Sequence, residues 1–235
     1  MSKNCRFQEL KRILSHDLPK ALKVVAFGLA FWFSTQHSAY GKEKEPLVIP
    51  ALNQSGVLPP FIQEFGPTSS AAMAPYGTSM AAVASRFTST PERKAIFEGL
   101  LNFREQLRQA GLVEGFQWLA GSYLEDCERY RGRPPKDVDI VTFARRPTGM
   151  EEMTAWQGFV QQNMHVFDKR LIKDTHMCDS YHVDLSLPTE AIVSSTRFWF
   201  GLFSHQRDTY LWKGILAVPL IDDDEAARQI LAGGE

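Results

Sequence analysis

Two aspartates separated by a single valine give this sequence its clearest chemical signal. Asp137-Val138-Asp139 opens an apolar segment that is typical of a β-strand. Side chains alternate across a strand, so both carboxylates are expected on one face. Two carboxylates this close repel each other, and burying them without a counter-charge is costly. Mg²⁺ removes the conflict, because it prefers oxygen ligands and leaves positions open for phosphate oxygens.

A third aspartate, Asp184, stands between the apolar residues Val183 and Leu185 on another predicted strand. If the two strands are neighbours, Asp137, Asp139 and Asp184 converge on one point. Three convergent carboxylates meet the requirement of two-metal phosphoryl transfer, in which cations stabilise both the attacking and the leaving oxygen. We therefore predict that all three aspartates are catalytic and bind metal, with two Mg²⁺ ions.

Gly121 and Ser122 follow a further predicted strand directly. A glycine at a strand end lets backbone amides approach a polyphosphate without a Cβ in the way, and the serine hydroxyl adds a donor. We predict that Gly121 and Ser122 bind the phosphates of a polyphosphate ligand. Lys213 is a further candidate for contact with phosphate.

The order of these features resembles the DNA polymerase β-like nucleotidyltransferase superfamily, and most closely its small bacterial members of unassigned role. The segments that carry the resemblance lie between residues 48 and 220: Ile49–Asn53, Leu58–Phe61, Trp118–Asp126, Pro135–Val141, Val183–Leu185 and Gly201–His205. The resemblance implies that Asp137 and Asp139 hold metal, that Gly121 and Ser122 cradle the triphosphate, and that Asp184 helps bind metal and accepts the proton of an attacking hydroxyl. The segment 123–136 is longer than in minimal members of the superfamily. It could shape substrate choice, or it could mark a fold that no longer catalyses.

Two functions of different classes follow. The first is Mg²⁺-dependent transfer of a nucleoside monophosphate from a nucleoside triphosphate (NTP) to a hydroxyl of a protein, an RNA or a small molecule. The second is a catalytically silent binding or regulatory module with a protein partner, such as one half of a toxin–antitoxin pair.

The elements needed to position these residues can be predicted from the same sequence. Strands are expected at 116–120, 137–143, 182–186 and 212–218. Helices are expected at 79–87, 90–110 and 189–203, in two pieces between 149 and 175 that are broken near Asn163, and at 222–231. Strands separated by helices in this way favour an α+β fold, with a mixed β-sheet and helices packed mainly on one face. The resemblance described above implies that this fold is nucleotidyltransferase-like.

The composition bears on nucleic-acid binding and on the cellular compartment of the protein. The chain has 235 residues and a net charge of -1, so no global basic field would draw it onto nucleic acid. Its three cysteines are scattered, which argues against a disulfide framework and fits a reducing compartment. Because NTPs are scarce outside the cytoplasm, we expect a cytoplasmic protein.

Residues 1–46 differ in character from the domain expected at 47–235. They contain an apolar run, Val24–Phe33, which is shorter than the roughly 20 residues that a membrane-spanning helix needs. No stable membrane insertion is therefore expected. The segment could be a disordered extension, a secretory signal, or the product of a start site upstream of the natural one.

Overall fold

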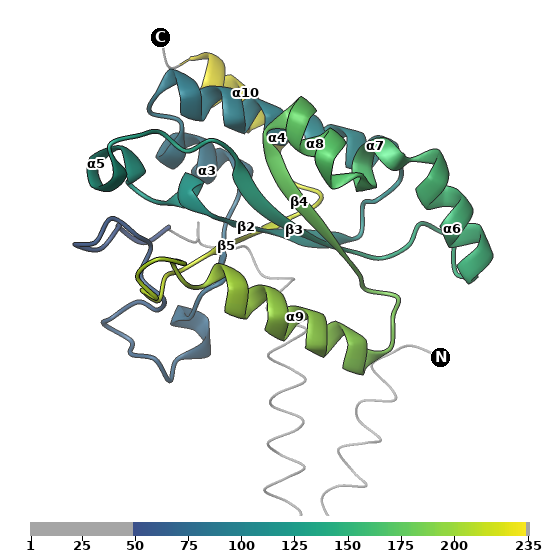
Figure 1. Cartoon of the computed structure of the whole chain (residues 1–235), viewed down its shortest axis with the longest axis horizontal. Coiled ribbons are helices and arrows are strands. Elements are labelled where there is room, and N and C mark those ends of the chain that lie inside the picture. The colour runs from purple at the N-terminus through teal and green to yellow at the C-terminus, as the bar shows by residue number, and fades with distance from the viewer. Residues whose placement is uncertain (1–48, 234–235) are drawn as a thin grey trace, which may run out of the picture. The chain divides into compact units, whose positions relative to one another are not determined.

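The computed structural model describes residues 49–233. The predictions made for residues 1–46 lie outside this range. Within it, the chain forms an α+β domain with a five-stranded mixed sheet and eight α-helices (Figure 1).

The sheet has the order β1-β5-β2-β3-β4. Its strands are β1 (Tyr76–Gly77), β2 (Gly115–Ala120), β3 (Val138–Ala144), β4 (Cys178–Asp184) and β5 (Leu216–Pro219). β2 lies in the centre and is antiparallel to both neighbours, β3 and β5, whereas β3 pairs with β4 in parallel and β1 pairs with β5 in parallel. The carboxyl end of β2 therefore meets the amino ends of β3 and β4 at the same edge of the sheet.

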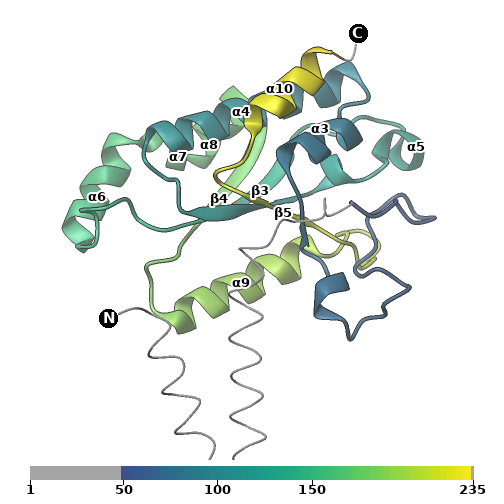
Figure 2. The same ribbon diagram turned by 180° about the vertical axis from the view of Figure 1, so that it is seen from behind.

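The helices are divided unequally between the two faces of the sheet. In Figures 1 and 2, α9 lies below the sheet, and α3, α4, α8 and α10 lie above it. The helix bounds are α3 (Met80–Phe87), α4 (Pro91–Gln109), α5 (Cys127–Arg131), α6 (Met153–Gln162), α7 (Met164–Phe167), α8 (Lys169–His176), α9 (Thr189–Phe203) and α10 (Asp224–Ala232). Two short 3₁₀ turns are η1 (Ser70–Ala72) and η2 (Ser122–Leu124). The prediction of a mixed sheet with helices mainly on one face is confirmed.

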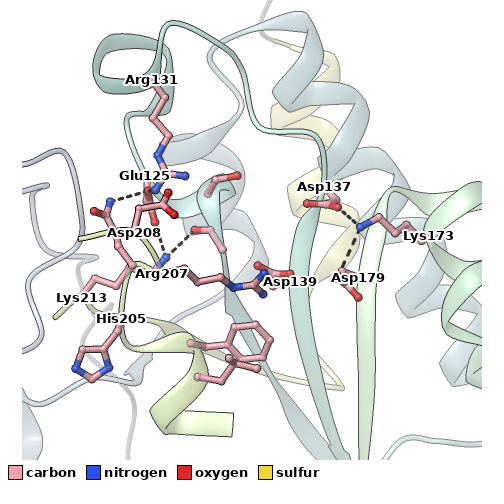
Figure 3. A pocket seen from close by; sticks show the side chains of 15 residues that line it. Glu125, Arg131, Asp137, Asp139, Lys173, Asp179, His205, Arg207, Asp208 and Lys213 are labelled. Carbon is pink, nitrogen blue, oxygen red and sulfur yellow. Dashed lines mark hydrogen bonds and ion pairs between the residues drawn. The ribbon is translucent and has the colours of Figure 1, made fainter. Parts of the chain in front are cut away.

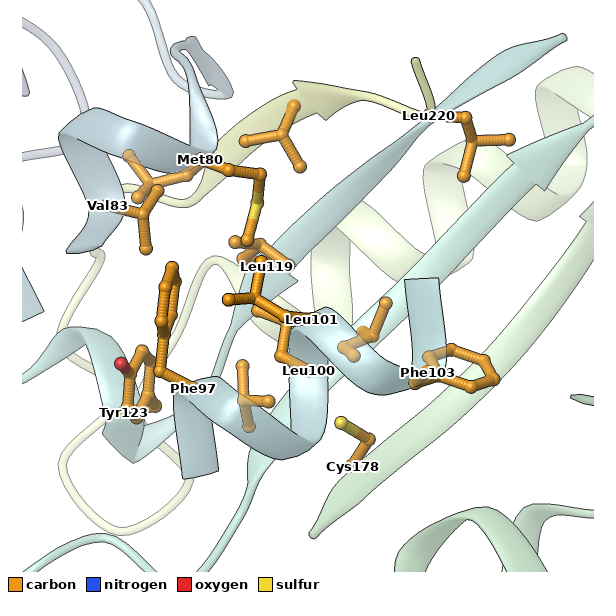
Figure 4. Close-up of a cluster of buried hydrophobic side chains, with 14 of the residues drawn as sticks. Met80, Val83, Phe97, Leu100, Leu101, Phe103, Leu119, Tyr123, Cys178 and Leu220 are labelled. Carbon is orange, nitrogen blue, oxygen red and sulfur yellow. The ribbon is translucent and has the colours of Figure 1, made fainter. Parts of the chain in front are cut away.

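Helix α4 is the longest of the described helices and lies in the larger helical layer. Thr90 caps it, accepting a hydrogen bond from the Arg93 amide, and Pro91 occupies its first turn, where no amide donor is needed. Its apolar face packs into the main core together with side chains of α3, β2 and β4. Figure 4 shows this core, which includes Met80, Val83, Phe97, Leu100, Leu101, Phe103, Leu119, Tyr123, Cys178 and Leu220.

A smaller cluster lies on the opposite face, between the sheet and α9. It joins Trp118, Val141 and Phe143 of the sheet to Phe203 of α9, with Trp199 packed at its side. Asp139 precedes Val141 and Phe143 at alternate positions of β3, so it shares their face of the sheet. The site is therefore expected at the end of the sheet on the α9 side.

Most predicted elements are present, with one consequential shift. β4 begins at Cys178, four residues before the predicted start at His182, because α8 ends in a left-handed residue, Met177 (φ 54°), and the chain extends directly from there. β1 was not predicted, and it has only two residues. The fourth predicted strand is shorter than expected, since β5 includes only Leu216–Pro219.

None of the helices in the described part of the chain combines the length and apolar character needed to cross a membrane.

Candidate functional site

A cavity of about 270 Å³ opens at the edge of the sheet where β2 ends and β3 and β4 begin (Figure 3). Five carboxylates and four lysine or arginine side chains line it. The acidic residues are Glu125, Asp137, Asp139, Asp179 and Asp208, and the basic ones are Arg131, Lys173, Arg207 and Lys213. This near balance of opposite charges, with few apolar neighbours, suits a polar or charged ligand.

The Asp-Val-Asp motif contributes both of its carboxylates to this cavity. Asp137 precedes β3 and Asp139 is its second residue, and both line the cavity, whereas Val138 and Ile140 are buried in the main core on the opposite face. Alternation along the strand thus separates two carboxylates from two core side chains.

Gly121 lies against Asp139 at the end of β2. Its φ of 81° and ψ of -167° belong to a backbone region that is almost confined to glycine. A Cβ atom on Gly121 would clash with Asp139 Oδ2, so any other residue at this position would force the aspartate side chain to move. Ser122 follows as the first residue of η2, and both residues line the cavity. The Gly-Ser turn and the Asp-Val-Asp motif therefore meet, as the sequence predicted.

The third carboxylate of the cavity is Asp179, which the sequence analysis did not select. Asp179 is the second residue of β4 and lies opposite Asp139 in the parallel β3–β4 register. It lines the same cavity as Asp137 and Asp139.

The prediction that Asp184 converges with Asp137 and Asp139 was wrong. Asp184 pairs with Ala144 at the far end of β3, five residues beyond Asp139, which corresponds to about 16 Å along the strand. It also differs from Asp179 by an odd number of residues, so its side chain leaves the opposite face of β4. There it forms a buried ion pair with Arg146, whose Nε lies 2.7 Å from Asp184 Oδ2. Asp184 has a partner of its own, far from the cavity.

The surroundings of Asp139 disfavour its negative charge. Burial, followed by the negative charges of Asp137 and Asp179, raises its pKa from 3.8 to about 6, although Lys213 and Arg207 act in the opposite direction. A raised pKa means that the fold disfavours the ionised form, so this position would gain from an added cation.

Two lysines of α8 supply counter-charges to the other two aspartates. Lys173 Nζ lies 2.6 Å from Asp137 Oδ2 and 3.7 Å from Asp179 Oδ2, and Lys169 Nζ lies 2.8 Å from Asp179 Oδ1. The hydrogen bond to Asp137 raises the pKa of Lys173. Within residues 49–233, no group of three or more His, Cys, Asp or Glu side chains is arranged so that it could hold a metal ion. Between Asp137 and Asp179 the positive charge is supplied by the Lys173 ammonium (Figure 3).

Lys213 lines the cavity, but its ammonium already has protein partners. It lies 2.5 Å from Glu125 Oε1 and 3.3 Å from the Gly121 carbonyl oxygen, and both Lys213 and Glu125 are buried. Glu125 also accepts hydrogen bonds from Arg131 and Gln206. As placed here, Lys213 holds the Gly121 turn in position, and its role in binding phosphate stays a prediction.

Arg207 is the basic residue of the cavity whose head group reaches toward the aspartates from the opposite side. It lies in the loop between α9 and β5 and is exposed, and its side chain extends across the cavity to Asp139 (Figure 3). Its charge contributes to lowering the pKa of Asp139. Arg207 is thus available for an anionic ligand that approaches the carboxylates.

Comparison with known proteins identifies a family but no activity. Residues 50–219 match the model described as a family of unknown function, DUF6932. The chain belongs to this family. The DUF6932 match includes every residue that lines the cavity. Neither the curated proteins nor the solved structures contain a match to this chain.

The residues missed within the DUF6932 match were Asp179, its partners Lys169 and Lys173, and Glu125. A signal for Asp179 was present. The helices between β3 and β4 require a crossover connection, which makes the two strands parallel. A carboxylate that meets Asp139 must then lie at the start of the second strand, where Cys178-Asp179 stands. Glu125 gave no such signal, because its partner Lys213 is remote in the sequence.

Proposed function

We propose that this protein transfers a nucleoside monophosphate from an NTP to a hydroxyl group of a protein, RNA or small-molecule acceptor, with Mg²⁺ as cofactor. One observation carries the proposal. Asp137, Asp139 and Asp179 line a single cavity with the Gly121-Ser122 turn, so three carboxylates and a turn suited to phosphate share one site.

The residues present fit a divalent cation. The ligands on offer are carboxylate oxygens, which suit Mg²⁺. The raised pKa of Asp139 and the ammonium between Asp137 and Asp179 both indicate that the fold favours positive charge at this position. We assign Asp137 and Asp139 as metal ligands. When bound, Mg²⁺ would stabilise negative charge on the phosphoryl oxygens.

The chain's own residues account for the remaining requirements of the reaction. The acceptor oxygen forms a bond to the α-phosphorus while the bond from that phosphorus to the bridging oxygen breaks, and its electron pair leaves with pyrophosphate. The acceptor's proton moves to a carboxylate, for which we assign Asp179. Gly121 and Ser122 bind the phosphates through backbone amides and the hydroxyl, and Arg207 neutralises the leaving pyrophosphate.

The test compares aspartates at the two ends of β4. Labelled NTPs and Mg²⁺ are incubated with cell lysate and wild-type protein, or with the variants Asp139→Ala, Asp179→Asn and Asp184→Asn. We expect label on an acceptor with wild-type protein, loss of label by at least about 100-fold in Asp139→Ala and Asp179→Asn, and retention in Asp184→Asn. Thermal melts establish that each variant is folded. Labelling that survives in Asp139→Ala would remove the proposed activity.

A second candidate function is a silent binding module, and the lysines of α8 favour it. Lys169 and Lys173 already neutralise two of the three aspartates, so the site is stable without an added ion. Such a module would bind an NTP without turnover. Calorimetry that detects NTP binding, combined with the absence of any labelled acceptor or released pyrophosphate, would select this function over the first.

A further inference from the structure

Lys173 occupies a position that two of the three site carboxylates share. Its ammonium lies 2.6 Å from an oxygen of Asp137 and 3.7 Å from an oxygen of Asp179. Figure 3 shows the side chain of Lys173, which comes from α8, reaching both aspartates from one side. In two-metal sites, metal ions lie between the carboxylates and balance their negative charge. In this protein the ammonium of Lys173 lies between Asp137 and Asp179.

The position of Lys173 divides the site into two unequal halves. On one side, Asp139 lies against Gly121 and lines the cavity. On the other side, Asp137 and Asp179 are both paired with lysines of α8. A divalent ion that approaches from the cavity meets the carboxylate that lacks a lysine. An ion that approaches the Asp137–Asp179 side must displace an ammonium.

We propose that Lys173 is a tethered cation that replaces the second metal ion, so that this site takes one divalent ion rather than two. The proposal rests on the proposed function, because it concerns the same carboxylates, and it revises the expectation of two Mg²⁺ ions. Lys173 thereby becomes a positioning residue, which fixes Asp137 and Asp179 around a single ion.

Lys169 provides a matched control. It lies one helical turn before Lys173, and the side chains of the two lysines are 47% and 46% exposed. Lys169 contacts only one of the site carboxylates, Asp179. Substituting either lysine removes one positive charge near the site, but only substitution of Lys173 empties the position between two carboxylates.

The experiment counts Mn²⁺ ions bound to the full chain without nucleotide. Mn²⁺ shares the preference of Mg²⁺ for oxygen ligands and can be followed by electron paramagnetic resonance and calorimetry. We expect one ion per chain in wild-type protein, in Lys169→Met and in Lys173→Arg, and two in Lys173→Met. In the double variant Lys173→Met/Asp179→Asn the number should return to one, because a carboxylate of the vacated position is lost.

The outcomes separate this inference from the proposed function. Two ions bound to wild-type protein, or one ion in Lys173→Met, would overturn the inference and leave the nucleotidyl-transfer proposal standing. Binding of two ions to Lys169→Met would also overturn the inference. The second ion would then result from the loss of any nearby positive charge and not from the vacated position of Lys173. Absence of Mn²⁺ binding in wild-type protein and in every variant would also overturn the inference, whereas the nucleotidyl-transfer proposal is tested separately by the labelling experiment with NTP present.

Discussion

At the scale of single residues, Asp139 combines a negative charge with a position in the sheet that disfavours that charge. It pairs with Ala120 and Asp179 in the sheet, lies against Gly121, and faces the negative charges of its two neighbouring aspartates. A stability-optimised fold would place a neutral side chain there. The site therefore carries an electrostatic cost, of the kind expected where charge is needed for binding or chemistry.

Neutralising Asp139 should stabilise the protein above pH 6. The folded-state pKa of about 6 exceeds the ordinary value of 3.8, so between these values the folded state binds more protons and stability falls as pH rises. At pH 7.5 Asp139→Asn is expected to raise the free energy of unfolding by about 1–2 kcal/mol, after allowance for partial solvent screening. Urea unfolding at several pH values measures this difference.

The same titration contains its own control. The advantage of Asp139→Asn should be complete above pH 6 and should shrink as pH falls toward about 4, because the wild-type carboxyl is then protonated in the folded state and the unfolded state begins to bind a proton near its ordinary pKa of 3.8. If the difference between the two proteins were the same at pH 4 and pH 7.5, the carboxylate would not be under the strain described here.

At the scale of elements, the site is assembled where three strand ends meet, and buried ion pairs fasten the loops around it. Lys213, just before β5, reaches across to Glu125, which follows η2. This pair connects the loop after α9 to the turn that carries Gly121 and Ser122. The phosphate-binding turn is thus held by residues that are far apart in the sequence.

Breaking this pair should be costly and non-additive. Lys213→Met leaves Glu125 buried with only Arg131 and Gln206 as partners, and we expect a loss of about 2–4 kcal/mol in the free energy of unfolding. The double variant Lys213→Met/Glu125→Gln should lose less than the sum of the two single variants, by at least about 1 kcal/mol. Chemical denaturation of the four proteins gives this coupling energy, and simple additivity would show that the two side chains act independently.

The sequence predicted elements with strong local signals better than elements defined by their partners. α4 has a capping threonine and a first-turn proline, and β3 has an apolar run behind two aspartates, so both were located nearly to the residue. β4 was located too late because Asp179 and Ser180 interrupt its apolar pattern. These two side chains lie on opposite faces of β4, where each lines a different cavity. Their polarity is explained by tertiary structure, which no local pattern reports.

The same distinction between local signals and distant partners applies to the residues of the site. Gly121, Ser122, Asp137 and Asp139 each belong to a short motif, and all four line the cavity. Asp184 was selected because its apolar neighbours are typical of a buried strand, and it is indeed buried, but with Arg146 at the other end of the sheet. Burial of a carboxylate therefore indicated a partner, and only the strand register could show which partner.

At the scale of the whole molecule, the C-terminal helix closes the main core. α10 packs against α3 and α4, and Asp224 at its start is buried with the guanidinium of Arg104 from α4. Arg104 is fully buried and also donates hydrogen bonds to Gln117 of β2 and to the carbonyl oxygens of Pro219 and Leu220. One side chain thereby joins a helix, the central strand and the last segment of the described chain.

Replacing Arg104 should destabilise the whole domain, including the site at the far edge of β2. Arg104→Met removes the donor to the side-chain oxygen of Gln117 and leaves Asp224 with Arg108 as its remaining ion-pair partner, so we expect a loss of about 3–5 kcal/mol in the free energy of unfolding. Arg108→Met is the matched control. Arg108 also contacts Asp224, at 2.6 Å, but its side chain is 21% exposed, and its loss should cost about 1 kcal/mol. Thermal and urea unfolding provide the comparison. Equal losses in the two variants would mean that burial of Arg104 adds nothing beyond the ion pair that Arg108 also makes with Asp224. A larger loss in Arg104→Met would establish the buried guanidinium as the connection between the C-terminal helix and the sheet that carries the site.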